Sequence, residues 1–493
     1  MFSTGIRQLQ KRLLSTASNS SNASSLKTAD IFIVGGGPAG LSLATAIKSS
    51  SVLDKFKTVL VDAGKLSEKV APFYTNPPSE YHNRVVSLTP RSKDFLTKKL
   101  GVSLLEDRIQ PYDGLYVTEG SSHARLSIER QSMLYMIEIL NIQSSLMPHL
   151  KQMNLPESSF SLKEDVKVTN IEYSRPEDPH SWPIVTLSNG DRYETRLLVG
   201  ADGFNSPVKK FSGIHQQLWW YNTFGLVATL KLASAPSSSS NPTHKLKGWQ
   251  RFLKWGPIAH LPLPGDNASL VWSTSGNELS KLLLAADPKV FAALINAAFI
   301  LDEADLEYYF KALANQSGSS TEAPTNEELL ADIKGRIEDV WNTLGDDSQI
   351  ESCYPPQVVD IVPDTRARFP LKFSHADTYI AERIALVGDA AHTTHPLAGQ
   401  GLNMGQHDVE QLTKALEHGA LRGLDIGSKL CLEPYWGFSY GFNATRLGMA
   451  DILHKLYGTD AWPVVQLRSL GLDITNNLGF LKNTIGDILS GKE

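Results

Sequence analysis

The chain has 493 residues, of which 41% are hydrophobic and 20% are charged, and its formal net charge is −5. This is ordinary globular composition for two or three packed domains, and the negative charge argues against a nucleic-acid-binding surface. The two cysteines, Cys353 and Cys431, form no C-x-x-C pair and no metal-ligand spacing, so neither a disulfide framework nor a metal site is expected. No run of 18 apolar residues predicts a transmembrane helix.

The N-terminal segment is basic and rich in serine, and it contains no acidic residue before Asp30. Its apolar residues recur near helical spacing beside Arg7, Lys11 and Arg12, which predicts a basic amphipathic helix. That pattern is typical of a mitochondrial transit peptide, predicted here over residues 1–27. A plain disordered tail is the alternative interpretation.

The first strand of the folded part is predicted at residues 31–34, a short β-branched run typical of a buried parallel strand. It leads into glycines with the G-x-G-x-x-G spacing and then into a helix of small residues. In dinucleotide sites such glycines make a tight turn and let the backbone approach a pyrophosphate, while the helix N-terminus attracts the phosphates. The predicted cofactor-binding residues are Gly35, Gly37, Pro38, Ala39 and Gly40.

A second strand is predicted at residues 58–61, and it ends at Asp62. This acid follows Gly40 at close to the spacing of roughly 20 residues that is expected for a ribose-binding carboxylate. Because a carboxylate favours a free 2′-hydroxyl, FAD or NAD is expected rather than NADP.

Two arginines in the next part of the chain are candidate cofactor contacts, although either could be solvated or salt-bridged. Arg84 lies in a predicted loop over residues 72–92, and Arg130 lies in a predicted helix over residues 125–146. An antiparallel pair of strands is predicted within residues 166–187. A further strand then ends in two more candidates, Asp202 and Gly203.

The middle of the chain is predicted to be sheet-like from residue 211 to 271 and then helical at 282–299, 303–314 and 327–341. Its tryptophans suit either an apolar pocket wall or a sheet core, and they are Trp219, Trp220, Trp249, Trp255 and Trp272. Residues 412–489 are predicted to be mostly helical. They could form a closing layer or a partner- or membrane-facing surface, and a structural layer is the preferred interpretation.

An apolar strand near the C-terminal end runs into an acid and a glycine-rich loop at residues 388–403. The acid can accept hydrogen bonds from sugar-like hydroxyls, and the glycines let the backbone approach a ligand closely. This favours a polyhydroxylated, phosphorylated cofactor over an ordinary turn. The histidines His392 and His395 are interpreted as structural rather than catalytic. The candidate contacts are Gly388, Asp389, Pro396, Gly399, Gly401, Leu402 and Asn403.

The three motifs, in this order, resemble those of the class A flavoprotein aromatic hydroxylases, which have the para-hydroxybenzoate hydroxylase-like fold. Within that family the chain is similar to the ubiquinone-biosynthesis hydroxylases. The transit-like start and the helical insert indicate the mitochondrial branch, which hydroxylates ring position C5 of the prenylated precursor. The residues that carry the resemblance are Gly35-x-Gly37-x-x-Gly40, Asp202-Gly203-x-x-Ser206, Gly388-Asp389 with its Pro-x-x-Gly-x-Gly loop, and the segments 84–90, 366–371 and 399–405.

The resemblance implies an α/β fold with a Rossmann-like FAD-binding domain, a β-sheet substrate domain and a C-terminal helical region. The FAD-binding domain is expected in two parts, residues 28–210 (with substrate-domain insertions) and 376–440. The substrate domain is expected at 211–375, with a helical insert at 303–345, and the C-terminal helical region at 441–493.

The resemblance also implies FAD as the cofactor, O2 as the oxidant and a polyprenylated phenol as the substrate. Asp389 would bind the ribitol or pyrophosphate part of FAD, and Asp62 would bind the adenosine ribose. No catalytic base is assigned; the residues expected beside the flavin are those of the loop Pro396, Gly399, Gln400 and Gly401. The expected location is the matrix side of the mitochondrial inner membrane, peripherally, within a ubiquinone-biosynthesis complex.

One position departs from the family pattern, because Lys209 stands where the family usually has arginine. Arginine and lysine are not interchangeable at bidentate sites, so direct reduction by a pyridine nucleotide is less strongly expected. The mitochondrial branch is associated with electrons from ferredoxin and its reductase. The alternatives left open are a class A monooxygenase for another aromatic or isoprenoid substrate, a reductase, and a non-catalytic flavin-binding subunit.

Overall fold

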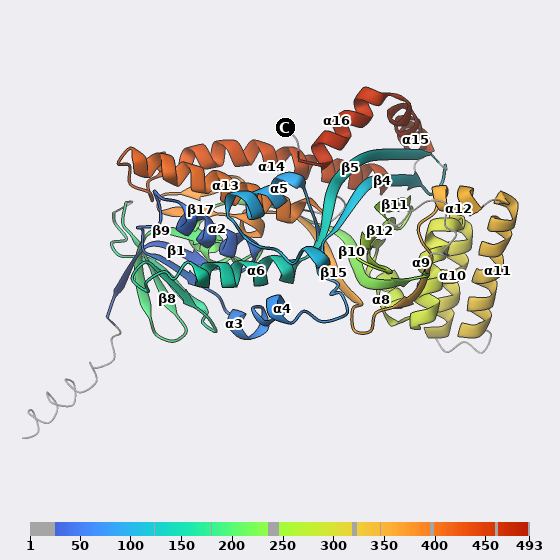
Figure 1. The fold of residues 1–493 in the computed structure, drawn as a ribbon. Helices are drawn as coiled ribbons and strands as arrows, with labels where there is room; N and C mark the ends of the chain where they lie inside the picture. The colour runs from blue at the N-terminus through green and yellow to red at the C-terminus, as the bar shows by residue number, and fades with distance from the viewer. Residues whose placement is uncertain are drawn as a thin grey trace, which may run out of the picture.

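The computed structural model describes residues 25–122, 124–178, 180–234, 246–317, 323–345, 347–394, 399–458 and 462–491. Nearly all of the predicted transit peptide lies outside these residues, as do His395 and Pro396. Two sheets and the helices that cover them make up the described part (Figure 1). No helix among the described residues is both long and apolar enough to cross a membrane.

The first sheet has eight strands, and its central ones are parallel, as the short apolar runs predict. Along the sheet the order is β16 (Ile380–Ala381), β17 (Ile384–Leu386), β9 (Arg192–Gly200), β1 (Lys27–Val34), β2 (Thr58–Val61) and β6 (Phe160–Lys163). The predicted antiparallel pair is confirmed as β7 (Val168–Tyr173) and β8 (Pro183–Leu187), and β8 also pairs with β9.

Helices that come from distant parts of the chain pack together beside this sheet (Figure 1). They are α2 (Pro38–Ser49), α6 (Ile139–Gln152), α13 (Gln400–Leu421) and α14 (Lys429–Tyr457). The small residues of α2 allow it to contact both α6 and α13, and α13 in turn contacts α14. Short helices border this unit: α3 (Leu66–Lys69), α4 (Pro72–Thr75), α5 (Pro90–Asp94), α7 (Pro207–Ser212) and single turns at Phe95–Lys99 and Glu106–Arg108.

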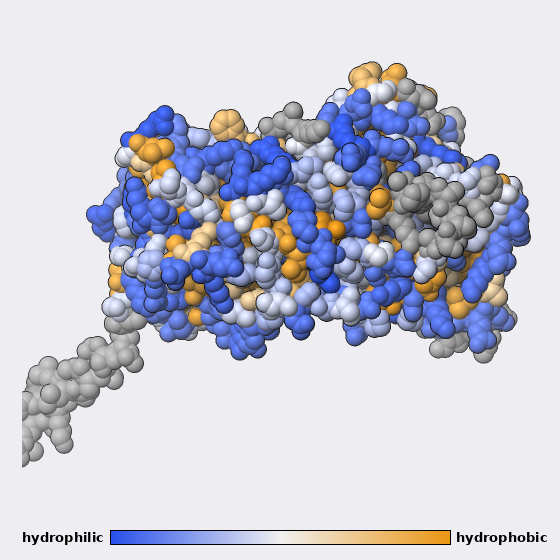
Figure 2. Space-filling view, in the orientation of Figure 1, coloured by the Kyte–Doolittle hydropathy of each residue, from blue (hydrophilic) through white to orange (hydrophobic). Residues whose placement is uncertain are grey.

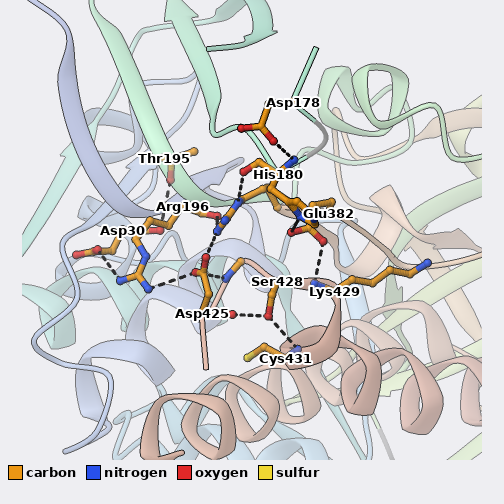
Figure 3. A network of polar contacts seen from close by, with 12 residues as sticks. Asp30, Asp178, His180, Thr195, Arg196, Glu382, Asp425, Ser428, Lys429 and Cys431 are labelled. Atoms are coloured by element: carbon orange, nitrogen blue, oxygen red, sulfur yellow. Dashed lines mark hydrogen bonds and ion pairs between the residues drawn. The ribbon is translucent and has the colours of Figure 1, made fainter. Parts of the chain in front are cut away.

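A polar network fixes the start of α14 against the first sheet (Figure 3). Arg196 of β9 lies 3.4 Å from Asp30 and 3.2 Å from Asp425, which belongs to the connection between α13 and α14. Glu382 accepts a hydrogen bond of 3.2 Å from the backbone N–H of Lys429. The end of the chain between β17 and α14 is thereby held to the first sheet, and this chain contains the predicted C-terminal half of the cofactor site.

The second sheet has ten strands. Along the sheet the order is β18 (His392–Thr393), β15 (Ala367–Ala376), β10 (Gln216–Leu232), β13 (Asn267–Ser275), β12 (Gly256–Leu263), β11 (Lys247–Leu253), β4 (Gln110–Glu119), β5 (Arg125–Glu138) and β3 (Val85–Leu88), and β14 (Val358–Ile361) pairs with β10. One face is covered by α8 (Asn277–Ala285), α9 (Pro288–Ile300) and α10 (Glu303–Ser317), while α11 (Asn326–Leu344) packs on α9 and α12 (Asp347–Cys353) contacts α11 (Figure 1).

Three sequence expectations are corrected here. The helix predicted over 125–146 is wrong for its first part, because residues 125–138 form β5, which pairs with β4 and β3. The loop predicted over 72–92 contains β3, whose partner strand supplies its hydrogen bonds. The single helix predicted at 282–299 is two helices, since Asp287 caps a new helix that begins at Pro288.

The positions of the tryptophans favour the sheet-core interpretation over the pocket-wall interpretation. Trp249 and Trp272 are buried at 2% and 0% exposure and pack with α9 and α10 in the core beneath the sheet. Trp219 stacks on Phe373 at 3.8 Å between ring centroids, and Trp220 is 56% exposed. None of the five lines the large cavity described below.

Candidate functional site

A cavity of about 1170 Å³ lies between the two sheets, where the carboxyl ends of the strands β1, β2, β9 and β17 face the second sheet. Parallel strands place their carboxyl ends at one edge, which is where ligands of such folds bind. Residues of all three sequence motifs lie together in one part of the cavity wall, and we call this part the cofactor half. The predicted residues in its wall are Gly35, Gly37, Pro38, Ala39, Asp62, Arg84, Asp202, Gly203, Gly388, Asp389, Gly399, Gly401 and Leu402.

The first glycine turn forms a cradle that is open toward the cavity. Gly35 has φ +107°, and a Cβ there would lie 2.4 Å from the carbonyl oxygen of Ala201. A Cβ at Gly40 would lie 1.9 Å from the carbonyl oxygen of Gly35, so this glycine is needed for turn and helix to approach each other. At Gly37 a Cβ would meet nothing within 4 Å. The N-terminus of α2 therefore faces free space that a pyrophosphate could fill.

Asp62 closes the cradle on the side of β2. Its two carboxylate oxygens accept hydrogen bonds of 2.6 Å from the backbone N–H groups of Gly36 and Gly64. The side chain of Gln143, on α6, donates to the carbonyl oxygen of Gly36 at 3.0 Å and also lines the cavity. Gln143 was not predicted, because a single glutamine in a helix gives no signal until the fold brings that helix to the turn.

Two carboxylates lie in the wall, and several basic residues stand near them. Burial raises the pKa of Asp389, and the electrostatic effects of His392, Lys372, Lys209 and Arg84 oppose this shift. Burial also raises the pKa of Asp202, to about 6, against the opposing effect of the Ser206 hydroxyl. Acids with raised pKa values in a cavity wall are typical of ligand sites, because a ligand can supply the missing donors.

Lys209 stands behind this wall rather than in it. Its side chain is 7% exposed, its ammonium group has no hydrogen-bond partner in the described structure, and burial lowers its pKa while Asp202 opposes the shift. The ammonium group lies 5.1 Å from the ring centroid of Phe204, and Lys372 lies 3.0 Å from the same centroid. The two lysines thus hold positive charge close to both acids of the wall.

A second-layer carboxylate, Asp408 of α13, fixes the Gly388-Asp389 turn. One oxygen accepts from the backbone N–H of Gly388 at 2.9 Å and lies 2.6 Å from Nε2 of His392. The other oxygen accepts from the side-chain amide of Asn443 on α14 at 2.9 Å. Both His392 and Asp408 are fully buried and lie outside the cavity wall. This geometry agrees with a structural role for His392.

The structure does not bring every candidate to the wall. Arg130 lies on β5 and forms an ion pair of 2.6 Å with Asp487, so it holds α16 (Gly479–Leu489) instead of facing the cradle. Asn403 is buried, where it accepts from the backbone N–H of Thr89 and donates to the carbonyl oxygen of Ser87. Gln400 also lies outside the cavity wall. Pro396 lies outside the described residues.

The other half of the cavity, here called the apolar half, lies against the second sheet and three C-terminal helices, α14, α15 (Trp462–Asn477) and α16. Its few polar groups include Gln250, Ser269 and Thr475. Most of its wall consists of apolar side chains, among them Leu115, Val117, Leu126, Ile128, Leu134, Met136, Leu261, Val271, Leu453, Leu456, Leu472, Ile485 and Leu489. An apolar ligand part of considerable length would fit here beside a polar cofactor.

The cofactor half fits a flavin dinucleotide. It offers an open glycine cradle at a helix N-terminus and an acid at the end of the second strand. A second acid, Asp389, lies in the 3-10 turn Gly388–Ala390 and belongs to the same wall. When bound, FAD would accept electrons from a separate donor and would supply the chemistry that activates O2. The residues described above would bind and orient it, and the walls would keep water out.

Comparisons with known proteins agree with this assignment. Residues 347–424 match the family model described as an FAD binding domain. Among solved structures, p-nitrophenol 4-monooxygenase PnpA from Pseudomonas putida superimposes with a TM-score of 0.61 at 14% identity, covering 95% of this chain and 100% of that one. The fold is therefore that of the FAD-dependent aromatic monooxygenases, the class that the site geometry also favours.

Relatives of much higher identity define the family within this class. The chain is 54% identical to the mitochondrial ubiquinone biosynthesis monooxygenase COQ6 of Saccharomyces cerevisiae, over 98% of both chains. It is 33% identical to COQ6 of Homo sapiens, over 94% of this chain and 93% of that one. The chain belongs to the COQ6 family of mitochondrial ubiquinone-biosynthesis monooxygenases. It is an FAD-dependent monooxygenase, as the three motifs predict.

Proposed function

We propose that this protein hydroxylates the aromatic ring of a polyprenylated phenol in ubiquinone biosynthesis, at ring position C5. The observation that carries this proposal is the joining of a polar cofactor half and a long apolar half in one cavity. A phenol ring at the junction would lie beside the flavin, while its prenyl chain would occupy the apolar half. The relatives named for ubiquinone biosynthesis support the pathway.

In this proposal the chain divides the work among its residues. The cradle at Gly37 and the carboxylate of Asp62 hold the adenosine and pyrophosphate part of FAD. Asp389 holds the ribitol part, in a position fixed through Asp408. Gly399 and Gly401 place backbone groups beside the flavin and exclude water. We also propose the division into FAD-binding, substrate and C-terminal helical regions given above.

We infer further that electrons come from ferredoxin and its reductase, and that the protein works peripherally on the matrix side of the inner membrane within a biosynthetic complex. Lys209 supports the first point, because the ammonium group that replaces a guanidinium is buried beside Asp202. A buried ammonium group cannot form the bidentate contact through which arginine recognises a phosphate.

Single-turnover measurements test the reaction. The FAD-loaded protein is photoreduced without oxygen and then mixed with O2 and a prenylated 4-hydroxybenzoate or phenol, and products are read by mass spectrometry. The expected result is a product heavier by one oxygen atom, with the hydroxyl at C5. Flavin reoxidation with an unchanged phenol would contradict the hydroxylase assignment, and failure to bind FAD after reconstitution would contradict the cofactor assignment of the cradle.

A further inference from the structure

Helices α15 and α16 form a hairpin that projects from the body of the molecule (Figure 1). The inner side of this hairpin contributes to the wall of the apolar half of the cavity, through Gly471, Leu472, Thr475, Ile485, Ile488 and Leu489. The hairpin is held to the second sheet by two ion pairs, Arg468 with Glu119 at 2.7 Å and Arg130 with Asp487 at 2.6 Å. It is therefore a fixed wall of the proposed substrate site.

The outer side of the same hairpin exposes large apolar side chains. Leu470, in the middle of α15, is 55% exposed, and Leu478 and Phe480, at the turn and in the first residues of α16, are 41% and 67% exposed. Figure 2 shows this end of the molecule as an apolar cap above a mostly hydrophilic surface. We call Leu470, Leu478 and Phe480 the hairpin patch. Large apolar side chains that are exposed on one projecting element mark contact sites more often than single scattered ones do.

The apolar half of the cavity is bordered by α14 and by the hairpin. Ile452 of α14 lines the cavity and is also 64% exposed, which makes it the candidate for the mouth of the apolar half. Leu453 and Leu456, on the same stretch of α14, pack against the same apolar cluster as Leu472 and Ile485 of the hairpin. A long apolar ligand could enter at Ile452 and pass along the inner side of the hairpin.

The charges near the hairpin patch suit a lipid surface better than a charged partner. Asp487 is paired with Arg130, and Asp451 lies 2.7 Å from Lys455, so these two carboxylates are compensated. Lys482 lies two residues after Phe480, donates a 3.5 Å hydrogen bond to the side chain of Asn476 and helps to lower the pKa of Glu129. Leucine, phenylalanine and a lysine at one helix end are typical of segments that insert into the headgroup region.

We propose that the hairpin patch docks on a phospholipid bilayer and that the prenyl chain of the substrate passes from the bilayer into the cavity at Ile452. This inference rests on the proposed prenylated substrate. A prenyl chain that left the bilayer through water would lose its apolar surroundings on the way, and a cavity mouth next to a docked hairpin avoids that exposure. The occupant of the patch is thus the lipid surface that holds the substrate.

Vesicle flotation tests the docking surface with the full FAD-loaded chain. The vesicles contain phosphatidylcholine, phosphatidylethanolamine and cardiolipin. The variant L470Q/L478Q/F480Q removes the hairpin patch, and the matched control Y308Q/V359Q/L421Q replaces three apolar side chains that are exposed at 49%, 50% and 70% elsewhere. We expect at least a tenfold fall in vesicle partitioning for the hairpin variant and parental partitioning for the control.

Single turnover with a water-soluble phenol that carries one short prenyl unit separates docking from chemistry. None of the three replaced residues lines the cavity, so the hairpin variant should hydroxylate this substrate at the parental rate. Parental vesicle binding by the hairpin variant, or an equal loss in the control, would overturn the docking proposal. If the parent binds vesicles through the patch but leaves the phenol unchanged, the proposed reaction fails and the docking surface stands.

Discussion

Gly37 presents its backbone to the cavity with no side chain in between, and this makes it the most direct test of the cofactor cradle. A Cβ at this residue would meet nothing within 4 Å, so Gly37→Val should fold normally while its side chain fills the space for the pyrophosphate. We expect FAD affinity to fall by at least about 100-fold, or roughly 3 kcal/mol. Fluorescence titration of the flavin-free protein measures this loss.

A glycine in similarly open surroundings provides the control. Gly335 lies in α11, and a Cβ there would also meet nothing within 4 Å, yet this residue is not part of the cavity wall. Gly335→Val should therefore retain parental FAD affinity. Tight FAD binding by Gly37→Val would show that the pyrophosphate lies elsewhere.

Asp202 should make the flavin-free protein less stable as the pH rises. Its pKa in the folded state, about 6, lies above the usual value near 3.8, so the folded state binds the proton more tightly than the unfolded state. The contribution of Asp202 to the free energy of unfolding is fully present below about pH 4 and is lost as the pH rises through 6. Relative to the parent, Asp202→Asn should gain roughly 2 to 3 kcal/mol between pH 4 and pH 7. Denaturant unfolding at both pH values measures this difference.

Asp191 provides a comparison, because its pKa is shifted in the opposite direction to that of Asp202. The hydrogen bond from Lys27 lowers the pKa of Asp191, so its stabilising effect is present above the ordinary carboxyl pKa and is lost as the pH falls. Asp191→Asn should therefore lose stability relative to the parent at pH 7 and approach the parent at pH 4. The same pH trend in both variants would contradict the assignment for Asp202.

At the scale of elements, the α15–α16 hairpin depends on a buried ion pair. Arg468 and Glu119 have side-chain exposures of 4% and 1% and lie 2.7 Å apart. Arg468→Met would leave the Glu119 carboxylate buried without its cation, which costs about 3 to 5 kcal/mol. We expect faster amide hydrogen exchange over residues 462–489, while β1 and β2 keep their protection.

The ion pair between Lys455 and Asp451 serves as the exposed counterpart. The Lys455 side chain is 65% exposed, so Lys455→Met should change exchange in the hairpin very little. The double variant E119Q/R468M should recover part of the protection, because it removes the uncompensated charge. Unchanged exchange in Arg468→Met would mean that apolar packing alone holds the hairpin.

The helices and strands also show which segments a sequence pattern predicts correctly and which it does not. The strand–glycine–helix unit at residues 31–49 was predicted well, because the apolar run, the glycine spacing and the helix are all local signals. The stretch 125–138 was predicted as a helix and is a strand, because its hydrogen bonds come from β4 and β3. Partners that are distant in sequence decide such segments, and composition does not reveal them.

At the scale of the whole molecule, FAD should stabilise both ends of the chain together, since its site joins residues 35–39 with residues 388–389 and 399–402. A ligand at 100 times its Kd contributes about 2.7 kcal/mol to the native state. We expect FAD to raise the thermal unfolding temperature by several degrees, with riboflavin giving a smaller increase because it lacks the pyrophosphate and adenosine. Equal effects of the two ligands would contradict the role of the cradle.

The sequence by itself determined the cofactor class, because the contacts to a dinucleotide come from a local glycine turn and from acids at fixed distances after short strands. It also indicated the family through three motifs in order. Tertiary structure alone decided that Arg130 pairs with α16, that Asp408 and Gln143 support the turns, and that an apolar half adjoins the cofactor half. These features are contacts between segments that lie far apart in the chain, and only packing brings such segments together.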